Sequence, residues 1–196
     1  ESLGYYYILL GAYYRTIRDL QKSYAFRKKL VALMETEDKH SLGFNYKYRV
    51  ALSNLLISQA EFGLTDEVNS SLHKIKNLEY PNSLERDNAL INVYNRVCSY
   101  YYLSGLFREA MTLIRETEQV FHLQERKIML HPRNIAVYYY NISCCYFGVP
   151  DFNQALSYLN RIFNELKLEQ SEDVYCFAHL LRLIIHYEKG NTDLIP

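Results

Sequence analysis

A ten-residue pattern occurs twice in this chain, 45 residues apart. It runs from Tyr101 to Ala110 (YYLSGLFREA) and again from Tyr146 to Ala155 (YFGVPDFNQA). In both copies an aromatic helix end precedes a turn residue, a Phe and an Ala. A unit of this kind cannot bury its apolar side alone, so neighbouring units have to stack. The pattern therefore predicts an array of helical hairpins, an architecture that more often binds other molecules than reacts with them.

The composition supports a helical chain and reduces the range of expected partners. Only seven Gly and four Pro occur among 196 residues, and Lys plus Arg equals Asp plus Glu at 22 each. Without a basic surplus, we expect neither nucleic acid nor a membrane surface as partner. The twenty Tyr are interpreted as packing residues of thin, partly exposed hairpin layers.

The compartment is predicted from the cysteines and from the absence of targeting signals. Cys98, Cys144, Cys145 and Cys176 show no paired framework and lie in apolar helical runs, which favours a reducing environment. No uncharged run approaches the ~20 residues that a membrane helix needs, and the first residues have no basic signal-peptide region. We therefore expect a soluble, cytoplasmic protein.

Helical periodicity sets the elements. Apolar residues recur at steps of three and four in 151–168, as on a surface helix with one apolar side, and 106–121 repeats the design. Asp151 and Ser104 stand where N-terminal caps are expected. Breaks are predicted at Gly63, Pro81, Gly105, Pro132, Pro150 and Gly190. The expected helices lie near 4–18, 21–36, 42–61, 65–79, 83–103, 106–122, 133–147, 151–167 and 172–189.

These segments resemble tetratricopeptide (TPR) repeats, which have small or aromatic residues at repeat positions 4, 8, 11, 17, 20, 24 and 27. With Ala155 at position 20, the other six are Tyr139, Ser143, Tyr146, Phe152, Leu159 and Ile162. With Ala110 at position 20, they are Tyr94, Cys98, Tyr101, Phe107, Ile114 and Thr117. With Val68 at position 20, a weaker match gives Leu52, Leu56, Gln59, Thr65, Leu72 and Ile75.

The resemblance implies an all-α superhelix, a TPR-like solenoid of about nine antiparallel helices. Repeat spacings of 42 and 45 residues exceed the usual 34, as in bacterial peptide-pheromone receptors and many uncharacterised bacterial TPR proteins. We expect one domain over 1–196, a fragment of a longer protein, with hairpins near 4–36, 42–79, 83–122 and 133–167 and an unpaired helix at 172–189. In the first hairpin either Ala25 or Leu30 could be the small residue at position 20.

Asparagines on the first helix of each hairpin are the best candidates for a site. In the TPR pattern, positions 2, 5, 6, 9, 12 and 13 face the concave groove, and an amide both donates and accepts hydrogen bonds to a peptide backbone. The alternative is that these amides bond neighbouring helices or face water. The candidate ligand-binding residues are Arg49, Asn54, Asn92, Asn95, Arg96, Ser99, Tyr102, Tyr140 and Asn141.

Nothing in the sequence predicts catalysis, a cofactor or a metal. The six His form no HExxH pair, Cys144 and Cys145 are adjacent and so point about 100° apart on a helix, and no glycine lies in a phosphate-binding loop. We expect a non-catalytic scaffold that binds a protein or peptide segment in the groove, with homo-oligomerisation possible. Two alternatives stay open: a sensory or oligomerisation domain of a larger bacterial regulator or signalling protein, and a catalytic all-α domain.

Overall fold

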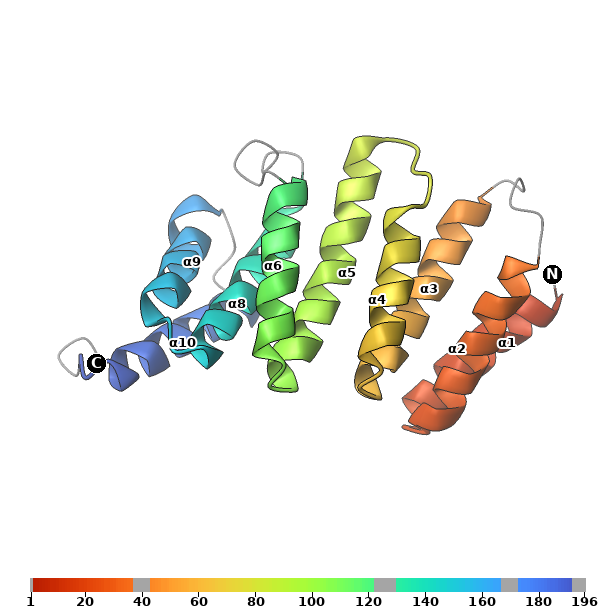
Figure 1. The fold of residues 1–196 in the computed structure, drawn as a ribbon, viewed down its shortest axis with the longest axis horizontal. Helices are drawn as coiled ribbons and strands as arrows, with labels where there is room; N and C mark the ends of the chain where they lie inside the picture. The colour runs from red at the N-terminus through yellow and green to blue at the C-terminus, as the bar shows by residue number, and fades with distance from the viewer. Residues whose placement is uncertain (1, 37–42, 122–129, 167–172, 192–196) are drawn as a thin grey trace. The chain divides into compact units, whose positions relative to one another are not determined.

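The computed structural model describes residues 2–36, 43–121, 130–166 and 173–191 (Figure 1). Within these ranges the chain forms nine helices and no strand, so the all-α prediction is confirmed. The chain divides into two compact units, unit 1 (Glu1–Pro81) and unit 2 (Asn82–Pro196). Their boundary falls at the predicted break at Pro81, and the prediction of one domain over 1–196 stays a prediction.

Unit 1 consists of two helical hairpins. The first pairs α1 (Ser2–Thr16) with α2 (Leu20–Glu35), and the second pairs α3 (Phe44–Glu61) with α4 (Thr65–Lys76). Helix α3 also packs on α2, and this contact joins the hairpins. The core of unit 1 is formed mainly by α3 and α4, where Leu52, Leu56, Val68 and Ile75 are at most 1% exposed.

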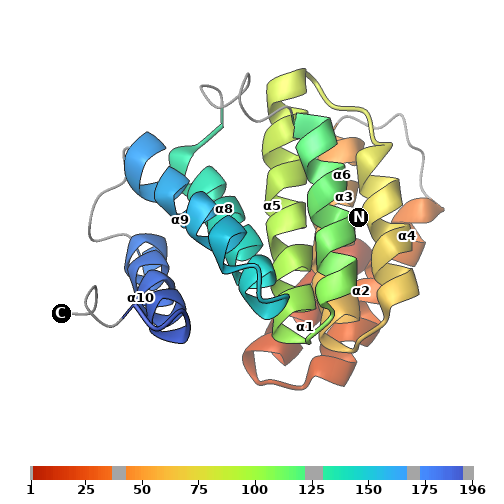
Figure 2. The same ribbon diagram turned by 60° about the vertical axis from the view of Figure 1, so that its left-hand side comes forward.

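Unit 2 has two hairpins and a single helix. Helix α5 (Ser83–Leu103) pairs with α6 (Phe107–Phe121), α8 (Pro132–Gly148) pairs with α9 (Phe152–Glu165), and α10 (Asp173–Glu188) packs on both α8 and α9 (Figure 2). Helices α5 and α8 also pack together. Gly148 lies against the ring of Phe107, so close that a Cβ on Gly148 would be 2.0 Å from Phe107 Cε1.

One turn geometry ends the first helix of every hairpin and also ends α10. In each case an N–H bonds to the carbonyl five residues earlier: Asp19 to Tyr14, Leu64 to Gln59, Leu106 to Tyr101, Asp151 to Tyr146 and Asn191 to His186. The residue before each donor has positive φ: Arg18, Gly63, Gly105, Pro150 and Gly190. This is the Schellman type of helix end, and it supplies a common register for all the repeats.

The shared turn gives the register of the first hairpin, which the sequence left open between Ala25 and Leu30. Counting from Arg18 as from Gly105 places Gly11 at position 8 and Ser23 at position 20, rather than Ala25 or Leu30. Ser23 is fully buried and its hydroxyl donates to the Gly11 carbonyl at 2.8 Å, whereas Ala25 is exposed. Two small residues thus meet where α1 packs on α2.

Helix ends follow local capping chemistry. The Asp151 carboxylate accepts from the Gln154 N–H at 3.1 Å, which confirms this predicted cap, and Asp19 and Asn82 cap α2 and α5 in the same way. The prediction for Ser104 was wrong, because Ser104 is the C-cap of α5 and α6 begins three residues later. Position 104 falls before the positive-φ glycine of the turn, and a helix can start only after it.

Candidate functional site

The common register identifies which side chains occupy the positions that face ligands in TPR repeats. In unit 2 the first helices of the repeats are α5, α8 and α10. Positions 2, 5, 9 and 12 hold Asn92, Asn95, Ser99 and Tyr102 on α5, Val137, Tyr140, Cys144 and Phe147 on α8, and Phe177, Leu180, Ile184 and Tyr187 on α10. These residues change from polar on α5 to apolar on α10.

Asn95 and Asn141 tie α5 to α8. They are 6% and 2% exposed, and the Asn141 amide donates to the Asn95 carbonyl at 3.1 Å and to Asn95 Oδ1 at 3.4 Å. Ser99 donates to Asn141 Oδ1 at 3.1 Å, and the Asn95 amide donates to the Asn134 carbonyl at 3.0 Å. These amides bond neighbouring helices, as in the alternative interpretation of their sequence pattern.

Tyr102, Tyr140 and Cys144 form a half-buried cluster beside this network. Burial raises the pKa of the Cys144 thiol to about 12, although hydrogen bonds from the hydroxyls of Tyr140 and Tyr102 act in the opposite direction. Burial also raises the pKa of Tyr102 to about 12, so both groups are neutral at ordinary pH. The Tyr140 ring lies 6.4 Å from the ring of Phe177, which connects α8 with α10.

Asn92 and Arg96 are exposed on α5. The Asn92 amide donates to the Asn88 carbonyl one turn earlier at 2.8 Å, so it already has a bond within its own helix. Arg96 offers a guanidinium to solvent on the same helix as the buried amides. Of the predicted site residues in unit 2, Asn95, Ser99 and Asn141 therefore lie together in one network, whereas Asn92 and Arg96 are exposed to solvent.

Four apolar side chains on α10, here called the α10 stripe, were missed by the site prediction: Phe177 (54% exposed), Leu180 (53%), Ile184 (40%) and Tyr187 (67%). They recur at steps of three and four residues and therefore lie on one side of the helix. Counting back from Gly190 would have placed them at positions 2, 5, 9 and 12 from the sequence alone. Exposed aromatic and aliphatic groups gathered in this way mark interaction surfaces.

The two predicted site residues of unit 1 differ in their surroundings. Asn54 is exposed at position 6 of α3, and its backbone carbonyl accepts from Arg27 Nη1 at 2.8 Å. Arg49 is half-buried between two rings, with its guanidinium carbon 5.2 Å from the centroid of Tyr46 and 5.5 Å from that of Tyr80. Arg49 is thus engaged in cation–π contacts on its own unit.

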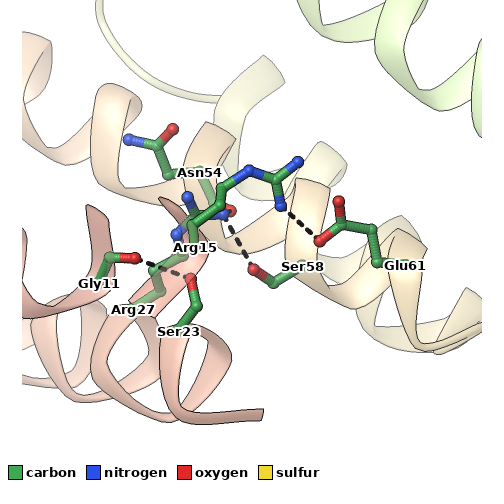
Figure 3. A network of polar contacts seen from close by, with 7 residues as sticks. All are labelled: Gly11, Arg15, Ser23, Arg27, Asn54, Ser58 and Glu61. Atoms are coloured by element: carbon green, nitrogen blue, oxygen red, sulfur yellow. Dashed lines mark hydrogen bonds and ion pairs between the residues drawn. The ribbon is translucent and has the colours of Figure 1, made fainter. Parts of the chain in front are cut away.

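Arg27 is a buried charged side chain of unit 1 to which no sequence pattern pointed. It is 9% exposed, and its Nη1 also donates to the Ser58 hydroxyl at 2.9 Å (Figure 3). Arg15 in the same region pairs with Glu61 at 2.6 Å. Arg27 occupies position 24, where the other repeats have Leu72, Ile114 and Leu159. The periodicity of apolar residues therefore does not reveal the repeat at this position.

Two of the cysteines, Cys98 and Cys145, are poorly placed to act as nucleophiles. Cys98 and Cys145 are buried with their sulfurs 3.6 Å apart, and this contact together with burial raises the pKa of Cys98 well above its usual value. A protonated thiol is a poor nucleophile. Within the described segments, no group of three His, Cys, Asp or Glu side chains could hold a metal ion, and no helix is long and apolar enough to cross a bilayer.

Comparison with known proteins agrees with the fold. No family model matches the chain, and no curated protein matches it. Among solved structures, the chain is similar to the crystal structure of nearly identical TPR-like repeats from a Podosopora anserina putative kinesin light chain, with a TM-score of 0.66 and 13% sequence identity. The match covers 97% of this chain and 89% of the other. The chain thus has a TPR-like helical-repeat fold, and the likeness to bacterial long-repeat proteins stays a prediction.

Proposed function

We propose that this chain is a non-catalytic scaffold that binds a segment of another protein along α5, α8 and α10 of unit 2. The observation that carries the proposal is the α10 stripe, whose four apolar side chains occupy the positions that contact ligands in TPR repeats. TPR-like repeats typically serve protein interaction, which makes a protein segment the natural ligand.

The surface also indicates which kind of segment fits. Leu180, Ile184 and Tyr187 offer apolar contact, while Arg96 on α5 offers a charge-assisted hydrogen bond to a carboxylate. The segment would therefore present aromatic or aliphatic side chains to α10 and an acidic group to α5. Asn95 and Asn141 take no direct part, since their amides already bond to the backbone of α5 and α8.

The test is a peptide selection followed by titration. Peptides selected from a random library on the wild-type chain are titrated by fluorescence anisotropy against Leu180→Asp and Arg96→Ala. Both side chains are exposed, so the folded state should survive, as circular dichroism would verify. We expect at least about a tenfold loss of affinity for Leu180→Asp and a loss of the preference for acidic peptides for Arg96→Ala.

Leu84→Asp is the matched control, because Leu84 is also exposed on unit 2 but lies at the start of α5, outside the repeat positions. It should bind as the wild type does. If folded Leu180→Asp binds the selected peptides as tightly as the wild-type chain, the α10 stripe is not the site.

A further inference from the structure

The first helix of unit 1 has an unusual surface. From Ser2 to Tyr14, α1 contains no charged residue, and the only buried residue in the whole helix is Gly11. A helix that is apolar on all sides is normally buried on all sides. In unit 1, α2 covers one side of α1, where Tyr14 stacks on Phe26 with ring centroids 5.6 Å apart.

The uncovered side of α1 is large enough for a stable protein interface. Six large apolar side chains of α1, together with Ile17 directly after the helix, are each between 47% and 68% exposed and are here called the α1 face: Leu3, Tyr5, Tyr6, Ile8, Leu9, Tyr13 and Ile17. With about half of an area on the order of 200 Å² exposed on each, the face offers roughly 700 Å². A standard protein interface buries about 800 Å² on each partner.

The pattern along the α1 face is self-complementary. Its central line runs Ser2, Tyr6, Leu9, Tyr13 and Thr16, in steps of four, three, four and three residues. That spacing is the one at which two helices pack side by side. Read from either end, the line gives a hydroxyl residue, a Tyr and then the central Leu. In a two-fold antiparallel pair centred on Leu9, each Tyr of this line would therefore lie near a Tyr of the other copy.

The charges near the α1 face allow a second copy to approach. Arg15 is the first charged residue after Ser2, and it is held by Glu61 of the same unit at 2.6 Å. Over Ser2–Thr16, two α1 helices would therefore meet without unpaired like charges. Helices that lie on membranes carry Lys and Arg along their polar side, and the single, already paired Arg15 does not provide this.

We propose that the α1 face is a homodimer interface, in which α1 packs antiparallel on α1 of a second copy with Leu9 near the two-fold axis. Each Tyr6 then lies close to the partner's Tyr13, and the phenol hydroxyls reach solvent at the rim while the rings are buried. The interface uses unit 1 alone and is independent of ligand binding at the α10 stripe.

The first test is the mass of the chain in solution. Light scattering over a concentration series should give twice the chain mass of 23.3 kDa at high concentration for the wild type, and Leu9→Glu should raise the dissociation constant at least about tenfold. Leu103→Glu is the matched control, since Leu103 is 77% exposed on unit 2; it should remain dimeric. A wild-type chain that is monomeric throughout, or a dimer unaffected by Leu9→Glu, would overturn the proposal.

Cysteine cross-linking tests the antiparallel geometry, with Cys176→Ser in every variant because Cys176 is exposed. Leu9→Cys should form a disulfide-linked dimer on oxidation. Ser2→Cys alone should not, because antiparallel packing separates the two copies of residue 2 by about 20 Å. A mixture of Ser2→Cys and Thr16→Cys chains should cross-link. Self-linking of Ser2→Cys would instead show a parallel pair and contradict the two-fold arrangement.

Discussion

The hairpins of unit 1 meet around a buried guanidinium, whereas those of unit 2 meet around a pair of buried amides. In unit 1, Arg27 of α2 bonds to the Asn54 carbonyl and the Ser58 hydroxyl of α3. In unit 2, Asn141 of α8 bonds to Asn95 of α5, and the Cys98 and Cys145 thiols pack nearby. The same repeat can thus be joined by a charged or a neutral group, provided that the buried polar atoms are satisfied.

The two junctions should respond differently to substitution. A buried charge interacts more strongly with its acceptors than a neutral amide does, because hydrogen bonds from charged donors are roughly twice as strong. Loss of Arg27 should therefore cost more than loss of Asn141. The following experiments test that order.

Arg27→Met removes the guanidinium but keeps an unbranched apolar side chain against Gly11. The Asn54 carbonyl and the Ser58 hydroxyl lose a charged donor, so we expect the free energy of unfolding to fall by about 3 kcal/mol. Urea denaturation measures the fall, and hydrogen exchange should locate it in α2 and α3. Lys28→Met, at the exposed neighbouring position, is the control and should change little. A loss below about 0.5 kcal/mol would mean that packing alone holds this junction.

Asn141→Leu removes the amide from the junction of unit 2 at similar volume. The Asn95 carbonyl and the Ser99 hydroxyl lose a partner, and the expected fall in the free energy of unfolding is about 2 kcal/mol. Asn92→Leu, an exposed asparagine on α5, should have a smaller effect.

The double variant Asn95→Leu/Asn141→Leu sharpens this result. Because both amides belong to one network, the double variant should lose less free energy of unfolding than the sum of the losses in the two single variants. Strictly additive effects would show that Asn95 and Asn141 act separately and that the junction is not a single network.

Replacing a helical glycine by alanine should destabilise unit 2 and stabilise unit 1. Gly148→Ala in unit 2 places a Cβ 2.0 Å from the Phe107 ring, so we expect a loss of about 1–2 kcal/mol from overpacking. Gly4→Ala in unit 1 meets no atom within 4 Å and should stabilise α1 by about 0.5–1 kcal/mol. Thermal melting measures both. Stabilisation by Gly148→Ala would mean that Phe107 moves aside at little cost.

Alkaline pH should affect unit 2 more than unit 1, with no effect at neutral pH. Burial raises the pKa of Tyr94, Tyr101 and Tyr102 from 10.0 to about 12 in unit 2. In unit 1, burial and the Glu67 contact raise the pKa of Tyr24 to about 12, and burial and the Glu35 contact also raise the pKa of Tyr48. A raised folded pKa means that this stabilisation is complete below pH 10 and is lost as the pH rises through 12.

Hydrogen exchange at increasing pH, corrected for the intrinsic exchange rate, should therefore show α5 losing protection before α2. Ultraviolet absorbance of the phenolate follows the titration itself. Earlier loss of protection in α2 would reverse the expected order of the two units.

How much of the fold could be predicted depends on how well each repeat keeps its small and apolar residues. Ala110 and Ala155 fixed the register of the hairpins of unit 2, and both are fully buried as expected. The first hairpin has Ser23 in place of Ala and Arg27 in place of an aliphatic residue, so periodicity could not reveal its register. The candidate site was predicted only by helix and face, because an Asn at a given position can turn its amide either to a ligand or to a neighbouring helix.

The helical hairpins follow from local signals in the sequence, because the spacing of apolar residues and the turns at Gly63, Gly105 and Gly190 act over a few neighbouring residues. Which polar groups are buried between hairpins, and which apolar groups stay exposed, depends instead on tertiary packing. How closely two helices approach decides the burial of the Asn95 and Asn141 amides and of the Arg27 guanidinium. It also decides the exposure of the α1 face and the α10 stripe. That distance is set by packing between residues far apart in the chain, and no local pattern records it.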